Sequence, residues 1–112
     1  MITETPEQWV VISLPATAHR PEHWRVFAGW RGGYLSEDRW KLNSGITQVV
    51  EEAEHIIFYG ASGSGYRCHK QGYGLREGLY LFSSYCQGVL EYKTAGEGIE
   101  ILPHTTDWTQ LV

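Results

Sequence analysis

Residues 75–96 read LREGLYLFSSYCQGVLEYKTAG, and this stretch decides the fold that the sequence predicts. Its apolar residues recur every three or four positions, at Leu75, Leu79, Phe82, Cys86 and Val89. That period places them on one face of an α-helix. Gly96 suits the left-handed position that commonly ends a helix. The spacing therefore predicts one long amphipathic helix over residues 75–96.

The rest of the chain is expected to form β-strands, because apolar and polar residues alternate along it. The expected strands are residues 9–14, 24–30, 39–51, 55–59, 66–70 and 99–102, with a short return strand at 34–35. The first is apolar on both faces, which predicts a covered or central strand. The alternation within 39–51 breaks near Gly45, where we expect a bulge or a sharp bend. Thr106 or Asp107 is expected to cap a closing turn at residues 108–111.

Together these segments predict a single domain of the α+β class. The chain has 112 residues, enough to bury a core without disulfides or a metal. We expect an antiparallel meander of about five or six strands, with the long helix packed on one face of the sheet.

Composition argues against several classes of function. The net charge is −4 and there is no run of Lys or Arg, so the basic surface that nucleic-acid binding requires is not expected. The longest apolar run, residues 9–14, is too short to span a bilayer. Residues 1–8 lack the apolar core of a signal peptide. The two cysteines, Cys68 and Cys86, are therefore expected to be reduced, and the protein to be cytoplasmic.

The loop from Gly60 to Gly65, with the sequence GASGSG, is the most unusual local composition. Glycine-rich loops can direct backbone N–H groups at a phosphate, and Ser62 and Ser64 would add hydroxyls. The loop is neither a Walker A sequence nor a nucleophile elbow. It favours a plain hairpin turn. The alternative is that the loop, with Arg67 and His69, forms the site of a small enzyme or of a nucleotide- or anion-binding protein.

No catalytic or metal-binding set is evident in the sequence. Cys68 and His69 are adjacent on an expected strand, so their side chains should point to opposite faces. Cys68 and Cys86 are both expected in the core, where free cysteine behaves as a small hydrophobe. The five histidines show no metal-ligand spacing. We expect no cofactor and no metal, and binding rather than catalysis.

Aromatic residues provide the leading functional hypothesis. Trp24, Trp30 and Trp40 share a parity within neighbouring strands, and Tyr34 is close to them in sequence. Trp and Tyr are favoured at interfaces and in small-molecule pockets. The alternative is that these residues fill the core. The aromatic set predicts a non-enzymatic binding or interaction module, homodimeric, that contacts a protein or a small ligand through one sheet face.

Two phrases, WKLNSGI at residues 40–46 and YGASGSGYRCH at residues 59–69, resemble small bacterial proteins of unknown role carried on mobile elements, of the integron gene cassette type. The resemblance covers roughly residues 24–110. It implies a cytoplasmic accessory protein, and it assigns no functional residue.

Overall fold

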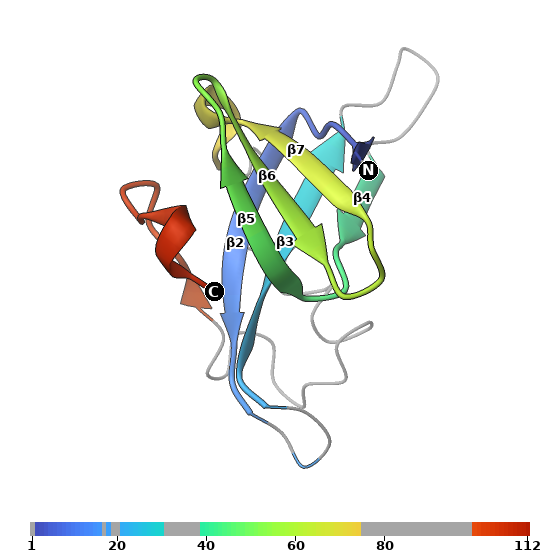
Figure 1. Ribbon diagram of the computed structural model, residues 1–112, viewed down its shortest axis with the longest axis vertical. Helices are drawn as coiled ribbons and strands as arrows, with labels where there is room; N and C mark the ends of the chain where they lie inside the picture. Colours follow the sequence, from blue (N-terminus) through green and yellow to red (C-terminus); the bar gives the residue numbers. More distant parts are fainter. Residues whose placement is uncertain (1, 17, 19–20, 31–38, 75–99) are drawn as a thin grey trace.

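The protein folds mainly into β-strands, as a computed structural model shows for residues 2–16, 18, 21–30, 39–74 and 100–112. These residues form two four-stranded sheets (Figure 1). The first has the strand order β1-β7-β6-β5, with β1 at Ile2–Glu4, β5 at Ile46–Glu51, β6 at His55–Gly60 and β7 at Gly65–His69. The second has the order β4-β3-β2-β8, with β2 at Gln8–Leu14, β3 at His23–Trp30, β4 at Arg39–Leu42 and β8 at Glu100–Ile101.

Neighbouring strands are antiparallel except for β1 and β7, which run parallel. Each sheet is therefore built mostly from strands that follow one another along the chain. Two short 3-10 helices, η1 at Lys70–Gly72 and η2 at Trp108–Gln110, complete the regular structure of the described residues.

The core lies between the two sheets. One buried cluster combines Trp9 and Val11 of β2, Val26 and Ala28 of β3, and inward-facing residues of the other sheet, namely Ile46, Ile56, Phe58, Tyr66 and Cys68. Successive strand residues point to opposite faces, so alternate residues of β2, β3, β6 and β7 enter this cluster. Each sheet thus buries its inner face against the other.

Strand β2 is buried on both of its faces, as its apolar sequence predicts. Trp9 and Val11 face the core between the sheets, and on the alternate positions Val10, Ile12 and Leu14 are at most 2 % exposed. The prediction of a covered or central strand is therefore confirmed.

The expected strand over residues 39–51 is in fact two strands in different sheets. Strand β4 ends at Leu42 and β5 begins at Ile46, and Gly45 between them has a φ of 120°. That backbone conformation is open to glycine at little cost. The bend predicted at Gly45 is confirmed, and it carries the chain from one sheet to the other.

The predicted α+β fold is wrong. The described residues hold no helix longer than the three residues of η1 and η2, and what packs on the inner face of each sheet is the other sheet. The physical reason is that two sheets with apolar inner faces can bury each other without a helical layer. The helix predicted over residues 75–96, Cys86 included, falls outside the described residues.

The closing turn near the C-terminus is confirmed. Asp107 caps η2, and its side chain accepts a hydrogen bond from the backbone N–H of Thr109 at 3.2 Å. In the part of the chain that the structure describes, no helix has the length and apolar character needed to cross a membrane.

Candidate functional site

The glycine- and serine-rich loop between β6 and β7 packs against the corner between β4 and β5, at the lower right of Figure 1. The backbone N–H of Ala61 donates to the carbonyl of Gly45 at 3.0 Å. The backbone N–H of Ser62 donates to the hydroxyl oxygen of Ser44, also at 3.0 Å. Gly63 has a φ of 90°, which lets the loop reverse direction tightly. Two segments about sixteen residues apart are thereby joined into one polar structure.

Three serine hydroxyls form a row across this junction. Ser44 Oγ lies 3.1 Å from Ser62 Oγ, and Ser62 Oγ lies 3.2 Å from Ser64 Oγ. Ser62 is exposed, whereas Ser44 and Ser64 are half-buried. The row links the corner to the start of β7.

Asn43 lies behind this row and is only 2 % exposed. Its backbone N–H donates to the carbonyl of Val26 at 3.0 Å, and its side-chain Oδ1 accepts from the backbone N–H of Val26 at 2.8 Å. Because a backbone N–H can only donate, this contact fixes which side-chain atom is the oxygen. The other atom, Nδ2, is buried and has no hydrogen-bond partner among the described residues. A buried donor left in this state costs about 1–3 kcal/mol.

A pocket of about 350 Å³ opens over Asn43. We call it the Asn43 pocket, and it is lined by Arg25, Lys41, Leu42, Asn43, Ser44, Ser62, Ser64 and Tyr66. Lys41 Nζ pairs with Glu4 Oε1 at 2.5 Å. Two basic residues, three serines and Asn43 therefore line the pocket, and Nδ2 of Asn43 is itself shielded from solvent.

Arg25 is oriented by a neighbour on its own strand. Its Nε donates to Nε2 of His23 at 3.0 Å, and Nδ1 of His23 lies 3.0 Å from the carbonyl oxygen of Pro21. Since the guanidinium can only donate, Nε2 is the accepting nitrogen and Nδ1 carries the proton. This arrangement fixes the orientation of the half-buried Arg25 guanidinium on β3.

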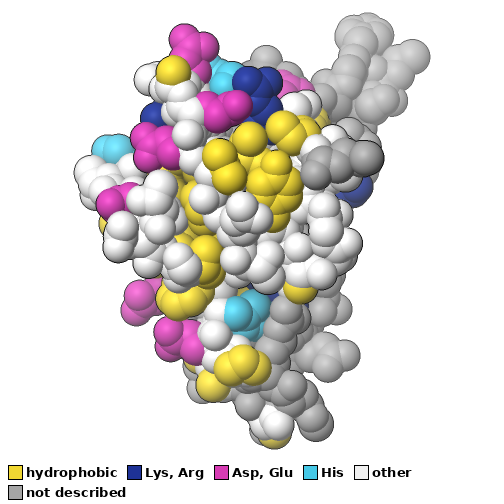
Figure 2. Space-filling model, viewed as in Figure 1, with side chains coloured by type: hydrophobic (Ala, Val, Ile, Leu, Met, Phe, Trp, Pro, Cys, Tyr) yellow, Lys and Arg dark blue, Asp and Glu magenta, His cyan; other side chains and the backbone are white. Residues whose placement is uncertain are grey.

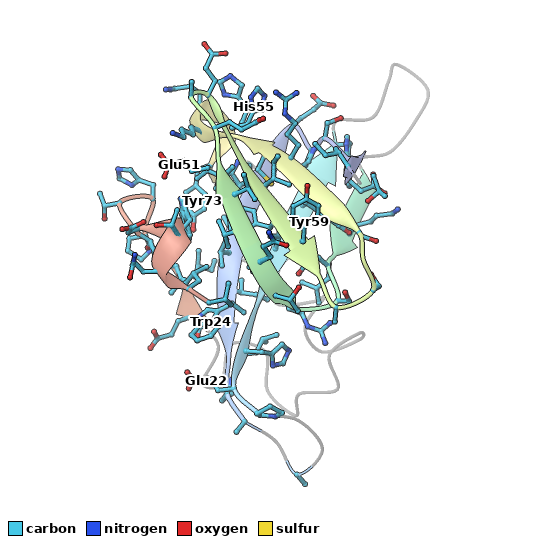
Figure 3. All side chains as sticks on the ribbon, viewed as in Figure 1. Glu22, Trp24, Glu51, His55, Tyr59 and Tyr73 are labelled. Carbon is cyan, nitrogen blue, oxygen red and sulfur yellow. The ribbon has the colours of Figure 1, made fainter. Side chains whose placement is uncertain are left out.

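The residues of the predicted anion site do not form one site. Ser62 and Ser64 lie at one end of β7, whereas His69 ends that strand at the other. Arg67 pairs with Glu52 at 2.9 Å. His69 accepts a hydrogen bond from the N–H of Gln71, and its ring contacts that of His55, which Figure 3 shows at the far end of the sheet.

The structure instead joins Ser62 and Ser64 to four residues that the sequence did not single out: Arg25, Lys41, Asn43 and Ser44. The available signal was the polar sequence Asn43-Ser44 directly before the bend at Gly45. Strand pairing then adds Arg25 of β3 and Lys41 of β4 to the lining, and a sequence pattern does not contain that pairing.

The pairing of β3 with β4 places the tryptophans of the leading hypothesis on two different faces of the sheet. Trp24 and Trp30 are half-buried and pack against the core. Trp40 pairs with Gly29, so in β4 it takes the parity opposite to that of Trp24 and Trp30. The Trp40 side chain and all of Tyr34 fall outside the described residues. The core alternative accounts for the packing of Trp24 and Trp30, and their role in binding stays a prediction.

A second aromatic group was not anticipated. Trp9, Tyr73 and Trp108 contact one another with ring centroids 4.7–5.5 Å apart, beside a pocket of about 190 Å³ (Figure 3 labels Tyr73). Trp9 Nε1 donates to the carbonyl of His69, and the Tyr73 hydroxyl donates to that of Leu102. Burial raises the pKa of Tyr73 to about 12, although the hydrogen bond from Val11 N–H opposes that shift. Because the rings contact one another, they serve mainly to join β2 to the C-terminal segment.

Cys68 occupies the predicted core position. It is fully buried, and burial raises the pKa of its thiol well above the ordinary value of 9.0. The described residues contain no group of three or more His, Cys, Asp or Glu side chains placed to hold a metal ion.

Comparison with known proteins finds no matching family model, no matching curated protein and no matching solved structure. The resemblance to proteins of the integron gene cassette type therefore stays a prediction.

Proposed function

We propose that the protein binds a small anionic ligand in the Asn43 pocket. The observation that carries this proposal is the lining of the pocket, where Lys41 meets Asn43 and the serine hydroxyls of two separate segments. Hydroxyl groups and an ammonium group can all donate hydrogen bonds to an anion oxygen.

The charges of the lining favour an anion over a neutral ligand. Arg25 and Lys41 come from adjacent strands, β3 and β4, and both residues line the pocket. Lys41 pairs with Ala28, so its side chain leaves the face of the sheet opposite to that of Arg25, and Lys41 is the cation on the same face as Asn43. One of the three N–H donors of Lys41 is used by Glu4, which leaves two for a ligand. Hydrogen bonds between ionised partners are about twice as strong as those between neutral groups. An anion here would gain charge-assisted contacts that a neutral molecule cannot make.

Replacing Lys41 tests the proposal. Isothermal titration calorimetry at low ionic strength would measure the affinity for acetate, sulfate and inorganic phosphate in the wild type and in Lys41→Gln. We expect Lys41→Gln to weaken the binding of whichever anions bind by about tenfold or more, because a hydrogen bond to a charged group contributes about 1.5–3 kcal/mol.

Lys70→Gln is the matched control for this experiment. Lys70 is also a lysine paired with a glutamate, Glu51, at 2.9 Å, but it does not line the Asn43 pocket. Its replacement should leave anion affinity unchanged. A wild-type protein that binds none of the three anions would contradict the proposal, as would equal losses in the two variants.

The homodimeric interaction module suggested by Trp24, Trp30, Tyr34 and Trp40 remains a separate prediction. Trp24 and Trp30 are half-buried against the core, so they offer a partner only part of their surface. The geometry therefore supports the Asn43 pocket better.

A further inference from the structure

We infer that a second pocket of the protein binds a small organic ammonium ion, which goes beyond the anion binding proposed for the Asn43 pocket. This second pocket has a volume of about 190 Å³ and is lined by residues of β2, β5, β6, the η1 region and the C-terminal segment. We call it the Trp108 pocket, and it combines four apolar or aromatic residues with five polar or charged ones. Figure 3 shows two of them, Glu51 and Tyr73, beside the C-terminal segment.

The apolar part of the Trp108 pocket is mainly aromatic. It consists of Trp9, Ile56, Tyr73 and Trp108. Trp9, Ile56 and Trp108 are at most 6 % exposed. The polar atoms of two of the rings are already used, because Trp9 Nε1 and the Tyr73 hydroxyl each donate to a backbone carbonyl. This side of the pocket favours the carbon skeleton of an organic ligand over a hydrated inorganic ion.

The volume of the Trp108 pocket limits the size of its ligand. At about 190 Å³ it is smaller than the range of about 300–1,000 Å³ that is typical of sites for drug-sized molecules. A cavity of about 150 Å³ is large enough to hold benzene. The pocket therefore suits a ligand of about one ring with a short substituent.

The polar part of the lining still offers oxygen atoms as hydrogen-bond acceptors. Asp107 Oδ1 accepts from the backbone N–H and the hydroxyl of Thr109, and Oδ2 has no partner among the described residues. Glu51 uses only Oε2 in its ion pair. The Thr106 hydroxyl donates to a backbone carbonyl at 2.6 Å, so its oxygen can only accept from a ligand. An ammonium group carries donors and no acceptor, and it matches these oxygens.

The charges of the lining also favour a cation. The pocket is lined by two carboxylates, Glu51 and Asp107, and by one ammonium group, that of Lys70. Lys70 Nζ lies 2.9 Å from Glu51 Oε2, so these two charges offset each other and the charge of Asp107 remains. A cation close to the face of an aromatic ring is attracted to it, most strongly for Trp. An organic ammonium ion would gain both attractions, and a carboxylate would gain neither.

A titration of the wild-type protein by nuclear magnetic resonance tests this inference. The probes are benzylamine, benzyl alcohol and benzoate, which share one ring and differ in charge. The titrations are made at low ionic strength and pH 8, above the range in which histidine ordinarily carries a charge, because His104 also lines the pocket. We expect benzylamine to bind about three times or more as tightly as benzyl alcohol, and benzoate to bind most weakly.

The indole N–H signals report where the probes bind. Benzylamine should shift the signals of Trp9 and Trp108, which line the pocket. Those of Trp24 and Trp30, which do not line it, should stay unchanged. Absence of a shift at both Trp9 and Trp108 would overturn the inference. Equal affinities for benzylamine and benzyl alcohol, or tighter binding of benzoate, would overturn the choice of a cation. None of these outcomes affects anion binding in the Asn43 pocket.

Asp107→Asn tests the source of the charge selectivity. It keeps an acceptor oxygen for the cap of η2 and removes the negative charge. We expect it to weaken benzylamine by about threefold and to leave benzyl alcohol unchanged. Glu100→Gln is the matched control, because it removes an exposed carboxylate of β8 that does not line the pocket. Equal losses of benzylamine affinity in the two variants would overturn the role given to Asp107.

Discussion

At the scale of single residues, Asn43 connects the fold to the candidate site. Its backbone and its side chain both hydrogen-bond to Val26, so this residue extends the pairing of β3 with β4 by one position where β4 ends. Because Oδ1 accepts the hydrogen bond from Val26, Nδ2 takes no part in the β3–β4 pairing. It has no acceptor in the described part of the chain. The feature that ends the strand therefore also leaves a buried amide donor without a partner beside the Asn43 pocket.

Cys68 gives a prediction at the same scale. Its side chain is fully buried between the sheets, and burial raises its thiol pKa, so both access and the reactive thiolate are lacking. We expect Cys68 to resist alkylation by iodoacetamide in native buffer and to react fully in denaturant. Peptide mapping by mass spectrometry after a short labelling pulse would measure this at Cys68 separately from Cys86. Rapid native labelling of Cys68 would contradict the packing described here.

At the scale of elements, the candidate site lies where strands end and loops meet. The residues that line the Asn43 pocket come from a corner, a loop and the neighbouring parts of β3, β4 and β7. The outer face of the sheet formed by β1, β7, β6 and β5 is different in character, and Figure 2 shows hydrophobic side chains gathered on this side of the molecule. Val50 on β5 is 38 % exposed there, opposite the largely buried Ile57 of β6. In the described residues, the polar Asn43 pocket thus lies where the chain changes direction, away from this hydrophobic face.

The cap of η2 gives a prediction at this scale. Asp107 Oδ1 accepts from both the backbone N–H and the hydroxyl of Thr109. Asp107→Ala should lower the free energy of unfolding by about 1 kcal/mol, because it leaves a helix-end N–H without its partner. Urea denaturation followed by circular dichroism would measure the change. Asp107→Asn keeps an acceptor oxygen and should cost clearly less, so an equal loss in the two variants would exclude capping as the cause.

At the scale of the whole molecule, stability depends on packing between segments that are far apart in the chain. Trp108, near the C-terminus, is 6 % exposed and contacts Trp9 of β2 and Phe58 of β6 with ring centroids 5.5 and 6.0 Å apart. These two strands belong to different sheets. The C-terminal segment therefore contributes directly to the core that holds the sheets together.

Trp108→Ala tests this contribution. Removing a large buried aromatic side chain typically costs about 3–5 kcal/mol, and we expect a loss of that size in urea denaturation. Trp24→Ala serves as the control, because Trp24 is half-buried at the margin of the same core and should cost less. A loss below about 1 kcal/mol for Trp108→Ala would show that the C-terminal segment is not part of the core.

What the sequence determined by itself is local. Apolar patterning located β2, β3, β6 and β7 within a few residues, but it missed β1 and joined β4 and β5 into one strand. Glycine located the bend at Gly45, and Asp107 was named as a possible cap. Each of these features depends on residues close together in the chain, through side-chain period, backbone freedom or a hydrogen bond within one turn. The burial of β2 on both faces and of Cys68 could be predicted for the same reason.

Only the tertiary structure decided how the strands are shared between sheets and which loops meet. The chain changes sheet at Gly45, so the layer that packs on each sheet is another sheet, and a single-sheet fold under a helix is excluded. The same change brings Ser44 beside Ser62, and strand pairing adds Arg25 and Lys41 while leaving Arg67 and His69 at other positions. Hydrophobic burial has no preferred direction, so an alternating strand fits a one-sheet and a two-sheet core equally well. Sheet membership and strand register are therefore set by contacts between distant segments, which the alternation of residues along the chain does not encode.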